Sequence, residues 1–163
     1  MKSLLIVFHS MTGGTAQIAE AAAEGAATED GVQVRLLRAP EAGPEDVLAA
    51  DGMIFACPEN LAAIAGLMKD FFDRCYYPVL DRVNGRPYAT MICAGSDGSN
   101  AARQVARIAA GWRLRQAAEP LIVCTHAQTP EAILAPKAVA APELQRCRDL
   151  GTAMAAGLAL GIL

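Results

Sequence analysis

Short apolar runs alternate with longer helical patterns along this chain of 163 residues. The runs predict β-strands at about 3–8, 32–37, 52–57, 88–94 and 119–124. No linker, internal repeat or low-complexity tract interrupts the alternation. Strands that alternate with helices pair in parallel through right-handed crossovers. The pattern therefore predicts an α/β fold, and the length favours a single domain over 1–163.

Three of the helical segments carry apolar residues at the spacing of one helix face, which predicts that this face packs on the sheet. The residues concerned are Leu67, Met68, Phe71, Phe72 and Cys75; Ala102, Val105, Ile108, Ala109 and Trp112; and Leu144, Cys147, Gly151, Met154 and Leu158. The C-terminal apolar run 151–163 is too short for a membrane span. We interpret it as part of a buried helix.

Glycines and hydroxyl side chains follow the first apolar run and precede an alanine-rich helical pattern. The residues are Ser10, Met11, Thr12, Gly13, Gly14 and Thr15. The start of a helix offers unpaired N–H groups and a partial positive charge, so this loop predicts an anion site, best suited to phosphate. Because it contains no lysine or arginine, we expect neutral donors alone to hold the phosphate. The alternative is an ordinary strand-to-helix turn.

The spacing within this loop excludes several other phosphate sites. No lysine follows Gly14, as the Walker A loop requires, and the third glycine of the dinucleotide fingerprint is missing. His9 and Ser10 stand where a cysteine-dependent phosphatase would have its nucleophile. A receiver domain would need acidic residues at this strand end, and the sequence has none there.

Composition and cysteine spacing narrow the class of protein further. A net charge of −3 and the lack of a basic cluster with aromatics do not predict nucleic-acid binding. The five cysteines lie far apart, without histidine partners at metal-ligand spacing, so we expect no metal site. An odd number of cysteines and no signal peptide predict a reducing, cytoplasmic setting. Cys57 is the one cysteine beside a candidate site, although a buried thiol is its simpler interpretation.

Three motifs give the chain a family resemblance. The pattern Ser10-x-Thr12-Gly13-x-Thr15 resembles the FMN-phosphate loop of flavodoxins. The segment from Cys57 to Arg74 resembles the flavin-facing loop and helix of NADPH-dependent FMN reductases and of NAD(P)H:quinone oxidoreductases of the tryptophan-repressor-binding-protein type. The third motif, Ala94 to Ser99, follows a strand in the position that this family requires.

The resemblance implies a flavodoxin-like three-layer sandwich with a five-stranded parallel sheet in the order 2-1-3-4-5. It also implies an FMN site where the loops after strands 1, 3 and 4 converge. The first loop, 10–15, would bind the phosphate. The other candidate residues are Pro58, Glu59, Asn60 and Leu61, along the flavin ring, and Ala94, Gly95, Ser96, Asp97 and Gly98, at its pyrimidine edge.

The chain departs from flavodoxin electron carriers in the loops that would cover the flavin. Carriers sandwich the ring between aromatic side chains, whereas this chain offers Leu61 and Ile64 in one loop and no aromatic between Met91 and Arg107. One ring face is therefore expected to be open, which favours hydride transfer from NADH or NADPH to a quinone or flavin. The alternatives are an electron carrier that serves a redox protein, and a non-catalytic module.

A few polar residues near these loops have two interpretations each. Glu59 could relay a proton near the flavin or simply be solvated, and His126 could reach the site of a neighbour in a homo-oligomer or lie at the surface. The segment 76–78 could form a dimer contact or frame the pocket. Asp70, Asp73 and Arg74 are expected to form helix-surface ion pairs, each of which contributes little stability.

Overall fold

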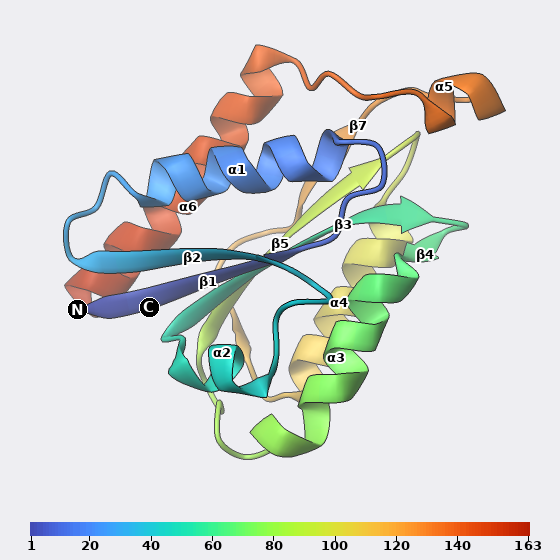
Figure 1. The fold of residues 1–163 in the computed structure, drawn as a ribbon. Helices are drawn as coiled ribbons and strands as arrows, with labels where there is room; N and C mark the ends of the chain where they lie inside the picture. The colour runs from blue at the N-terminus through green and yellow to red at the C-terminus, as the bar shows by residue number, and fades with distance from the viewer.

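A parallel β-sheet forms the centre of the molecule in the computed structural model, which describes residues 1–163 (Figure 1). Its five principal strands are β1 (Lys2–Phe8), β2 (Val32–Arg38), β3 (Gly52–Asn60), β5 (Pro87–Ala94) and β7 (Leu121–Cys124). They lie in the order β2-β1-β3-β5-β7, and all pair in parallel. The predicted order 2-1-3-4-5 is therefore confirmed.

Two short strands add to the predicted five. β4 (Ala63–Ile64) turns back antiparallel on the end of β3, and β6 (Arg115–Gln116) pairs with the start of β5. The edge of β5 is thus shared by β6 and β7. The predicted strand at 119–124 begins only at Leu121, after Pro120, whose ring nitrogen has no N–H to donate to a ladder.

Helices cover both faces of the sheet (Figure 1). On one face lie α1 (Gly14–Ala26) and α6 (Ala141–Leu160); on the other lie α2 (Pro44–Ala49), α3 (Gly66–Val79) and α4 (Ser99–Gly111). The short helix α5 (Pro130–Leu134) lies at the end of the molecule toward which the arrows of β3 and β5 point. No helix, α6 included, combines the length and apolar character that crossing a membrane requires.

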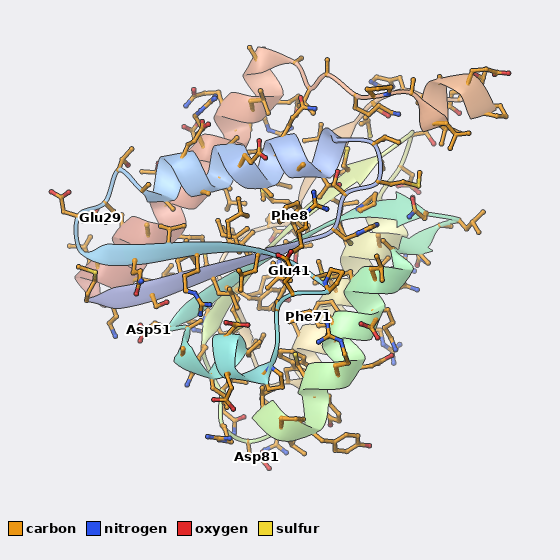
Figure 2. The ribbon with its side chains drawn as sticks, in the orientation of Figure 1. Phe8, Glu29, Glu41, Asp51, Phe71 and Asp81 are labelled. Atoms are coloured by element: carbon orange, nitrogen blue, oxygen red, sulfur yellow. The ribbon has the colours of Figure 1, made fainter.

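The sheet separates two hydrophobic cores of 25 and 20 buried residues. Most of the predicted core positions are buried, but Leu67 is 45% exposed, because it lies near the start of α3. Phe71 points into the interior, whereas Asp81 lies at the outer surface (Figure 2).

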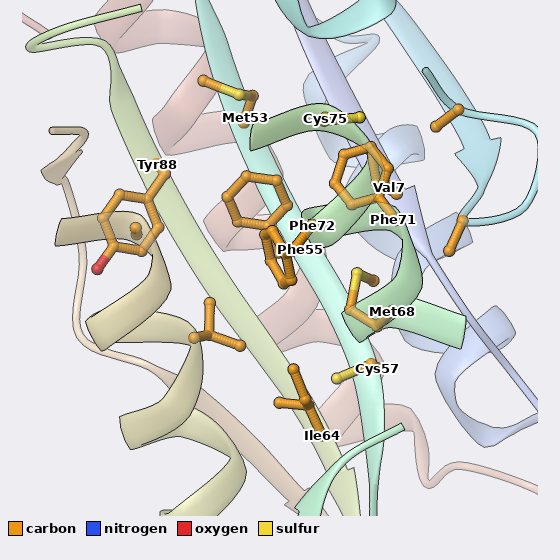
Figure 3. Close-up of a cluster of buried hydrophobic side chains, with 14 of the residues drawn as sticks. Val7, Met53, Phe55, Cys57, Ile64, Met68, Phe71, Phe72, Cys75 and Tyr88 are labelled. Carbon is orange, nitrogen blue, oxygen red and sulfur yellow. The ribbon is translucent and has the colours of Figure 1, made fainter. Parts of the chain in front are cut away.

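The aromatic side chains are concentrated in the larger core. Phe55, at the centre of β3, lies with its ring centroid 5.0 Å from that of Phe72, and Trp112 packs edge-on against Phe72 at 5.5 Å. Figure 3 shows Phe55, Phe71 and Phe72 gathered between β3 and α3. Edge-to-face pairs of this kind add stabilisation beyond that from burial of the rings. The few aromatics of this chain thus stabilise its interior.

Candidate functional site

The loop between β1 and α1 forms a tight cradle at the carboxyl end of the sheet. Gly13 adopts a left-handed conformation with φ of 96°, which glycine reaches without strain. Its N–H donates to the Ser10 hydroxyl at 3.1 Å, so the side chain of Ser10 shapes the loop from within. The helix α1 then begins at Gly14 with no side chain capping its first turn.

Backbone N–H groups in this cradle have no acceptor within the chain. No hydrogen bond within the chain is donated by the N–H groups of Met11, Thr12, Gly14 and Thr15. The first N–H of α1 to bond to a backbone carbonyl is that of Gln17, which donates to Gly13. A helix start whose donors lack side-chain partners is a ready anion site. The predicted cradle therefore has free donors in the places where a phosphate would need them.

Gly14 leaves room that any other residue would fill. A Cβ at this position would lie 2.8 Å from the Cys93 sulfur, closer than such atoms pack. Cys93 lies beneath the loop, where burial raises the pKa of its thiol. The sulfur therefore stays uncharged at neutral pH and does not repel an anion above it.

The second loop is the β3–β4 hairpin, whose tip is sharply turned. Leu61 and Ala62 both adopt left-handed conformations, with φ of 50° and 59°, and the Leu61 side chain is fully exposed. Pro58 and Asn60 remain within β3, where Pro58 pairs with Cys93 of the neighbouring strand. This pairing brings the second loop beside the first and third.

Glu59 is a structural residue of this hairpin. Its carboxylate accepts the N–H groups of Gly98 and Ala101, each at 3.0 Å, and so caps the start of α4. An anionic cap at a helix start is stabilising. The interpretation of Glu59 as a solvated carboxylate is wrong, and the proton-relay interpretation is disfavoured because both oxygens are already engaged.

The third loop continues from β5 and is held by the chain that follows β7. The N–H of Thr125 donates to the carbonyl of Ala94, and the N–H of His126 donates to that of Gly95, both at 2.8 Å. The Asp97 carboxylate accepts hydrogen bonds from Ser99, which lowers the pKa of Asp97, and its side chain is exposed. Asp97 therefore supports the start of α4.

One pocket, open to solvent, lies where the three loops meet. Ten of the fifteen candidate residues line it: Ser10, Met11, Thr12, Gly14, Thr15, Pro58, Glu59, Asn60, Ala94 and Gly95. The other five, Gly13, Leu61, Ser96, Asp97 and Gly98, lie in the same loops but do not line it. The convergence expected from the order of the strands is therefore observed.

Five lining residues were not anticipated from the sequence: Cys93, Thr125, Ala127, Ile133 and Lys137. Four of them come from the segment after β7, which has no motif of its own. Only the position of this segment after a strand at the edge of the sheet could have suggested that it reaches the pocket.

Lys137 corrects the expectation that neutral donors alone surround the phosphate loop. Its ammonium group lies 3.3 Å from the Thr12 hydroxyl, although the two residues are far apart in the sequence. The loop itself contains no lysine or arginine. The fold supplies one from elsewhere.

No aromatic residue lines the pocket. The larger aromatic side chains are committed to the core, and Tyr77, which is 79% exposed, lies on α3 away from the pocket. The suggestion that segment 76–78 frames this pocket is therefore wrong.

The histidines near the loops do not line the pocket either. Burial and the charge of Arg38 lower the pKa of His9, whose N–H donates to the carbonyl of Ala56 at the strand end. His126 is exposed, in a left-handed turn with φ of 58°. Both act through the backbone, at the ends of strands.

The expected ion pairs of α3 are present, and Arg74 of one pair also makes hydrogen bonds to another segment. Lys69 pairs with Asp73, and Arg74 with Asp70, both at 2.7 Å. Arg74 also donates to the carbonyls of Ala39 and Ala42, which ties α3 to the segment after β2. Arg74 is therefore a bridge between elements as well as a partner in a surface pair.

Cys57 lies beside the second loop but is chemically quiet. It is buried, and burial raises the pKa of its thiol to about 12. Since the thiolate is the reactive form, this thiol is unreactive at neutral pH. All five cysteines are free.

About half of the sequence is similar to that of known proteins. The curated relatives include a protein named flavodoxin from Aquifex aeolicus, which is 35% identical over 98 residues, covering 60% of this chain and 53% of that protein. A protein named NAD(P)H dehydrogenase (quinone) from Acidithiobacillus ferrooxidans is 35% identical over 94 residues, or 45% of this chain and 47% of that protein. The chain thus spans about half the length of the curated relatives it matches.

Solved structures share the whole fold. A flavodoxin from the domain Archaea superposes with a TM-score of 0.77 at 16% identity, covering 96% of this chain and 98% of that one. A WrbA-like flavodoxin from Agrobacterium tumefaciens gives 0.70 at 20% identity, covering 99% of both chains. At such identities the likeness establishes the flavodoxin-like fold and no more.

The family match is more specific, because it covers the second and third loops. The family described as NADPH-dependent FMN reductase matches residues 39–128. This range contains Pro58–Asn60, Ala94 and Gly95, which line the pocket. Since the match extends over more than half of the sequence, the chain belongs to the NADPH-dependent FMN reductase family.

Proposed function

We propose that this chain binds FMN in the pocket between its three loops and transfers hydride from NADH or NADPH to a quinone or a similar small acceptor. The observation that carries the proposal is the convergence of unpaired backbone donors, a half-buried lysine and an aromatic-free rim in one pocket. Membership of the NADPH-dependent FMN reductase family supports the same assignment.

The residues present fit a flavin monophosphate. Gly14 keeps the floor of the first loop open, and the N–H groups of the cradle have no competing acceptor. These groups, with the hydroxyls of Ser10, Thr12 and Thr15, would hold the phosphate. The second loop, Pro58–Leu61, would lie along the ring, and Ala94–Gly98 would approach its pyrimidine edge. Bound FMN would supply the hydride chemistry itself, while the protein orients it.

The protein's own contribution is a fixed frame around the ring. Glu59 ties the second loop to the third through the amides at the start of α4. Gln104 of α4 accepts the N–H of Ile64 at 2.8 Å, which fixes the returning arm of the hairpin. Because these loops are tied together, their backbone donors can hold a flavin in one orientation. The aromatic-free rim leaves space for a planar acceptor to stack.

An anaerobic titration tests this proposal. FMN-loaded protein should lose the absorbance of oxidised flavin on addition of NADH or NADPH, and a quinone should restore it. If the flavin stays oxidised in excess of both reductants, the reductase assignment is wrong. Wild-type protein that retains no FMN would refute the cofactor assignment as well.

A one-electron carrier is the second candidate, supported by the relative from Aquifex aeolicus that is named flavodoxin. Stepwise reduction with dithionite separates the two functions. A carrier would take up electrons in two well-separated one-electron steps, whereas the proposed reductase would pass directly to the two-electron-reduced form.

The setting and assembly of the protein are further parts of the proposal. Five free cysteines, four of them buried, fit a reducing compartment, so we place the activity in the cytoplasm. The exposed Tyr77 on α3 is a suitable contact for a homo-oligomer. Sedimentation of wild-type protein and of Tyr77→Glu would test that contact, which predicts a smaller species for the variant.

A further inference from the structure

A lysine distant in sequence reaches the phosphate loop. The Lys137 ammonium donates to the Thr12 hydroxyl at 3.3 Å and to the carbonyls of Ile133 and Ala135 at 2.7 and 2.6 Å. The lysine is half-buried and lines the pocket. A charge in this position faces the same space as the free N–H groups of the loop.

The backbone around Lys137 is fastened to the first loop and to α1. The N–H of Lys137 donates to the carbonyl of Thr12 at 2.9 Å. The Gln17 amide donates to the carbonyl of Lys137 at 2.7 Å and accepts the N–H of Val139 at 2.9 Å. Gln17 thus clamps the chain on both sides of the lysine. The main chain of Lys137 is therefore held in place independently of the hydrogen bonds that its ammonium makes.

The stem of the Lys137 side chain packs beside the start of α1. A Cβ at Gly14 would lie 3.5 Å from the Lys137 Cβ, in addition to its overlap with Cys93. The first is an ordinary contact distance, which shows that the lysine stem lies against this helix start. Pro136 restricts the backbone just before the lysine. Both features hold the ammonium group close to the cradle.

Lys137 lacks an anionic partner. It takes part in none of the ion pairs of the chain, and all its side-chain hydrogen bonds go to neutral oxygens. Glu59, the carboxylate in the same pocket, is engaged by the amides of Gly98 and Ala101. A half-buried cation beside unpaired amides is complementary to a phosphate dianion.

We propose that Lys137 binds the phosphate of FMN and makes the pocket selective for the phosphorylated flavin over riboflavin. The inference rests on the proposed function and adds a residue from outside the family match, which ends at residue 128. An ammonium reaches the phosphate as a point charge, so its contribution is absent for a ligand that lacks the phosphate.

Equilibrium binding of two flavins tests this role directly. Dissociation constants for FMN and for riboflavin are measured by flavin fluorescence with wild-type protein and with Lys137→Met, which keeps the apolar stem. The variant should bind FMN about ten-fold more weakly, equivalent to about 1.4 kcal/mol. Its affinity for riboflavin should be unchanged, so that its preference for FMN falls about ten-fold.

Two further variants sharpen the result. Lys137→Arg keeps the charge and should keep most of the preference for FMN. Lys69→Met removes a lysine of α3 that pairs with Asp73 and does not line the pocket, so it should match the wild type. Added salt should weaken FMN binding more in the wild type than in Lys137→Met, because the charge interaction is screened.

The outcomes separate this inference from the function on which it rests. If wild-type protein binds FMN and Lys137→Met binds it equally well, the role of Lys137 is refuted and the function stands. An equal loss of FMN and riboflavin affinity would make Lys137 a structural residue and refute the selectivity. Wild-type protein that binds neither flavin would overturn both. If Lys137→Met does not fold, as judged by circular dichroism, Lys137→Gln replaces it under the same criteria.

Discussion

The Glu59 carboxylate accepts the N–H of Gly98 at 3.0 Å, across two loops that are 39 residues apart in sequence. Its other oxygen accepts the N–H of Ala101, so one side chain both caps α4 and closes the wall of the pocket. A residue of the second loop thus supports the architecture of the pocket. The same contacts hold this carboxylate in place at the end of β3.

Replacement of Glu59 should therefore be measured first as a loss of stability. Glu59→Ala removes the cap of α4 and should lower the free energy of unfolding by about 1–2 kcal/mol. Glu59→Gln keeps one acceptor oxygen and should fall between this variant and the wild type. Urea denaturation gives these values. A Glu59→Gln protein of wild-type stability with a greatly slowed flavin reduction would instead indicate a proton relay.

A negative charge at Thr12 should expel the cofactor. Thr12→Glu places a carboxylate next to Lys137 and the free amides, where it competes with the phosphate. FMN affinity should fall by about 100-fold or more through charge repulsion, while the fold is retained. Thr28→Glu, at the opposite end of α1, is the matched control. The flavin content of each purified variant measures the effect. An unchanged flavin content in Thr12→Glu would refute the assignment of this loop to the phosphate.

A methyl group between α1 and α6 should destabilise the fold. A Cβ at Gly151 would overlap the carbonyl of Ala22, because the two helices cross with their backbones in contact. Gly151→Ala should cost about 1–3 kcal/mol, as overpacking does. Gly66→Ala adds the same methyl group where no atom lies within 4 Å. Thermal unfolding of the two variants should differ accordingly, and equal melting temperatures would contradict the close crossing.

Buried thiols should make the protein sensitive to high pH. The pKa of Cys57 is raised from 9.0 to about 12, and that of Cys147 from 9.0 to about 11, both mainly by burial. An unfolded chain releases these protons at lower pH than the folded one, so stability is intact below pH 9 and declines as pH rises toward 12. Urea midpoints from pH 8 upward would reveal the decline.

Labelling of the cysteines at neutral pH tests whether their thiols are buried. Native protein should leave Cys57, Cys75, Cys93 and Cys147 unlabelled by a thiol reagent, since all four are buried, and only the half-buried Cys124 should react. Denatured protein should react at all five. Rapid labelling of Cys57 in the native state would contradict the burial of its thiol beside the second loop.

The local pattern of this sequence determined the sheet and its loops. Five largely apolar runs specified the parallel strands, and the central ones are nearly continuous because they are buried on both faces. The cradle at Ser10–Thr15 followed from chain-local properties: glycine conformations, hydroxyl side chains and the start of a helix. The placement of three loops at one sheet edge followed from the alternation of strands and helices, with the strand order supplied by the family resemblance.

Tertiary structure decided which side chains meet. Lys137 lies beside Thr12 because Gln17 binds a segment 120 residues away and the Lys137 N–H donates to the Thr12 carbonyl, and no local pattern encodes such contacts. Glu59 became a helix cap for a helix that starts in another loop. Strand alternation and glycine conformation depend on neighbours in sequence, so the sequence alone reveals them. The charge at the phosphate loop depends on long-range packing, so only the folded chain supplies it.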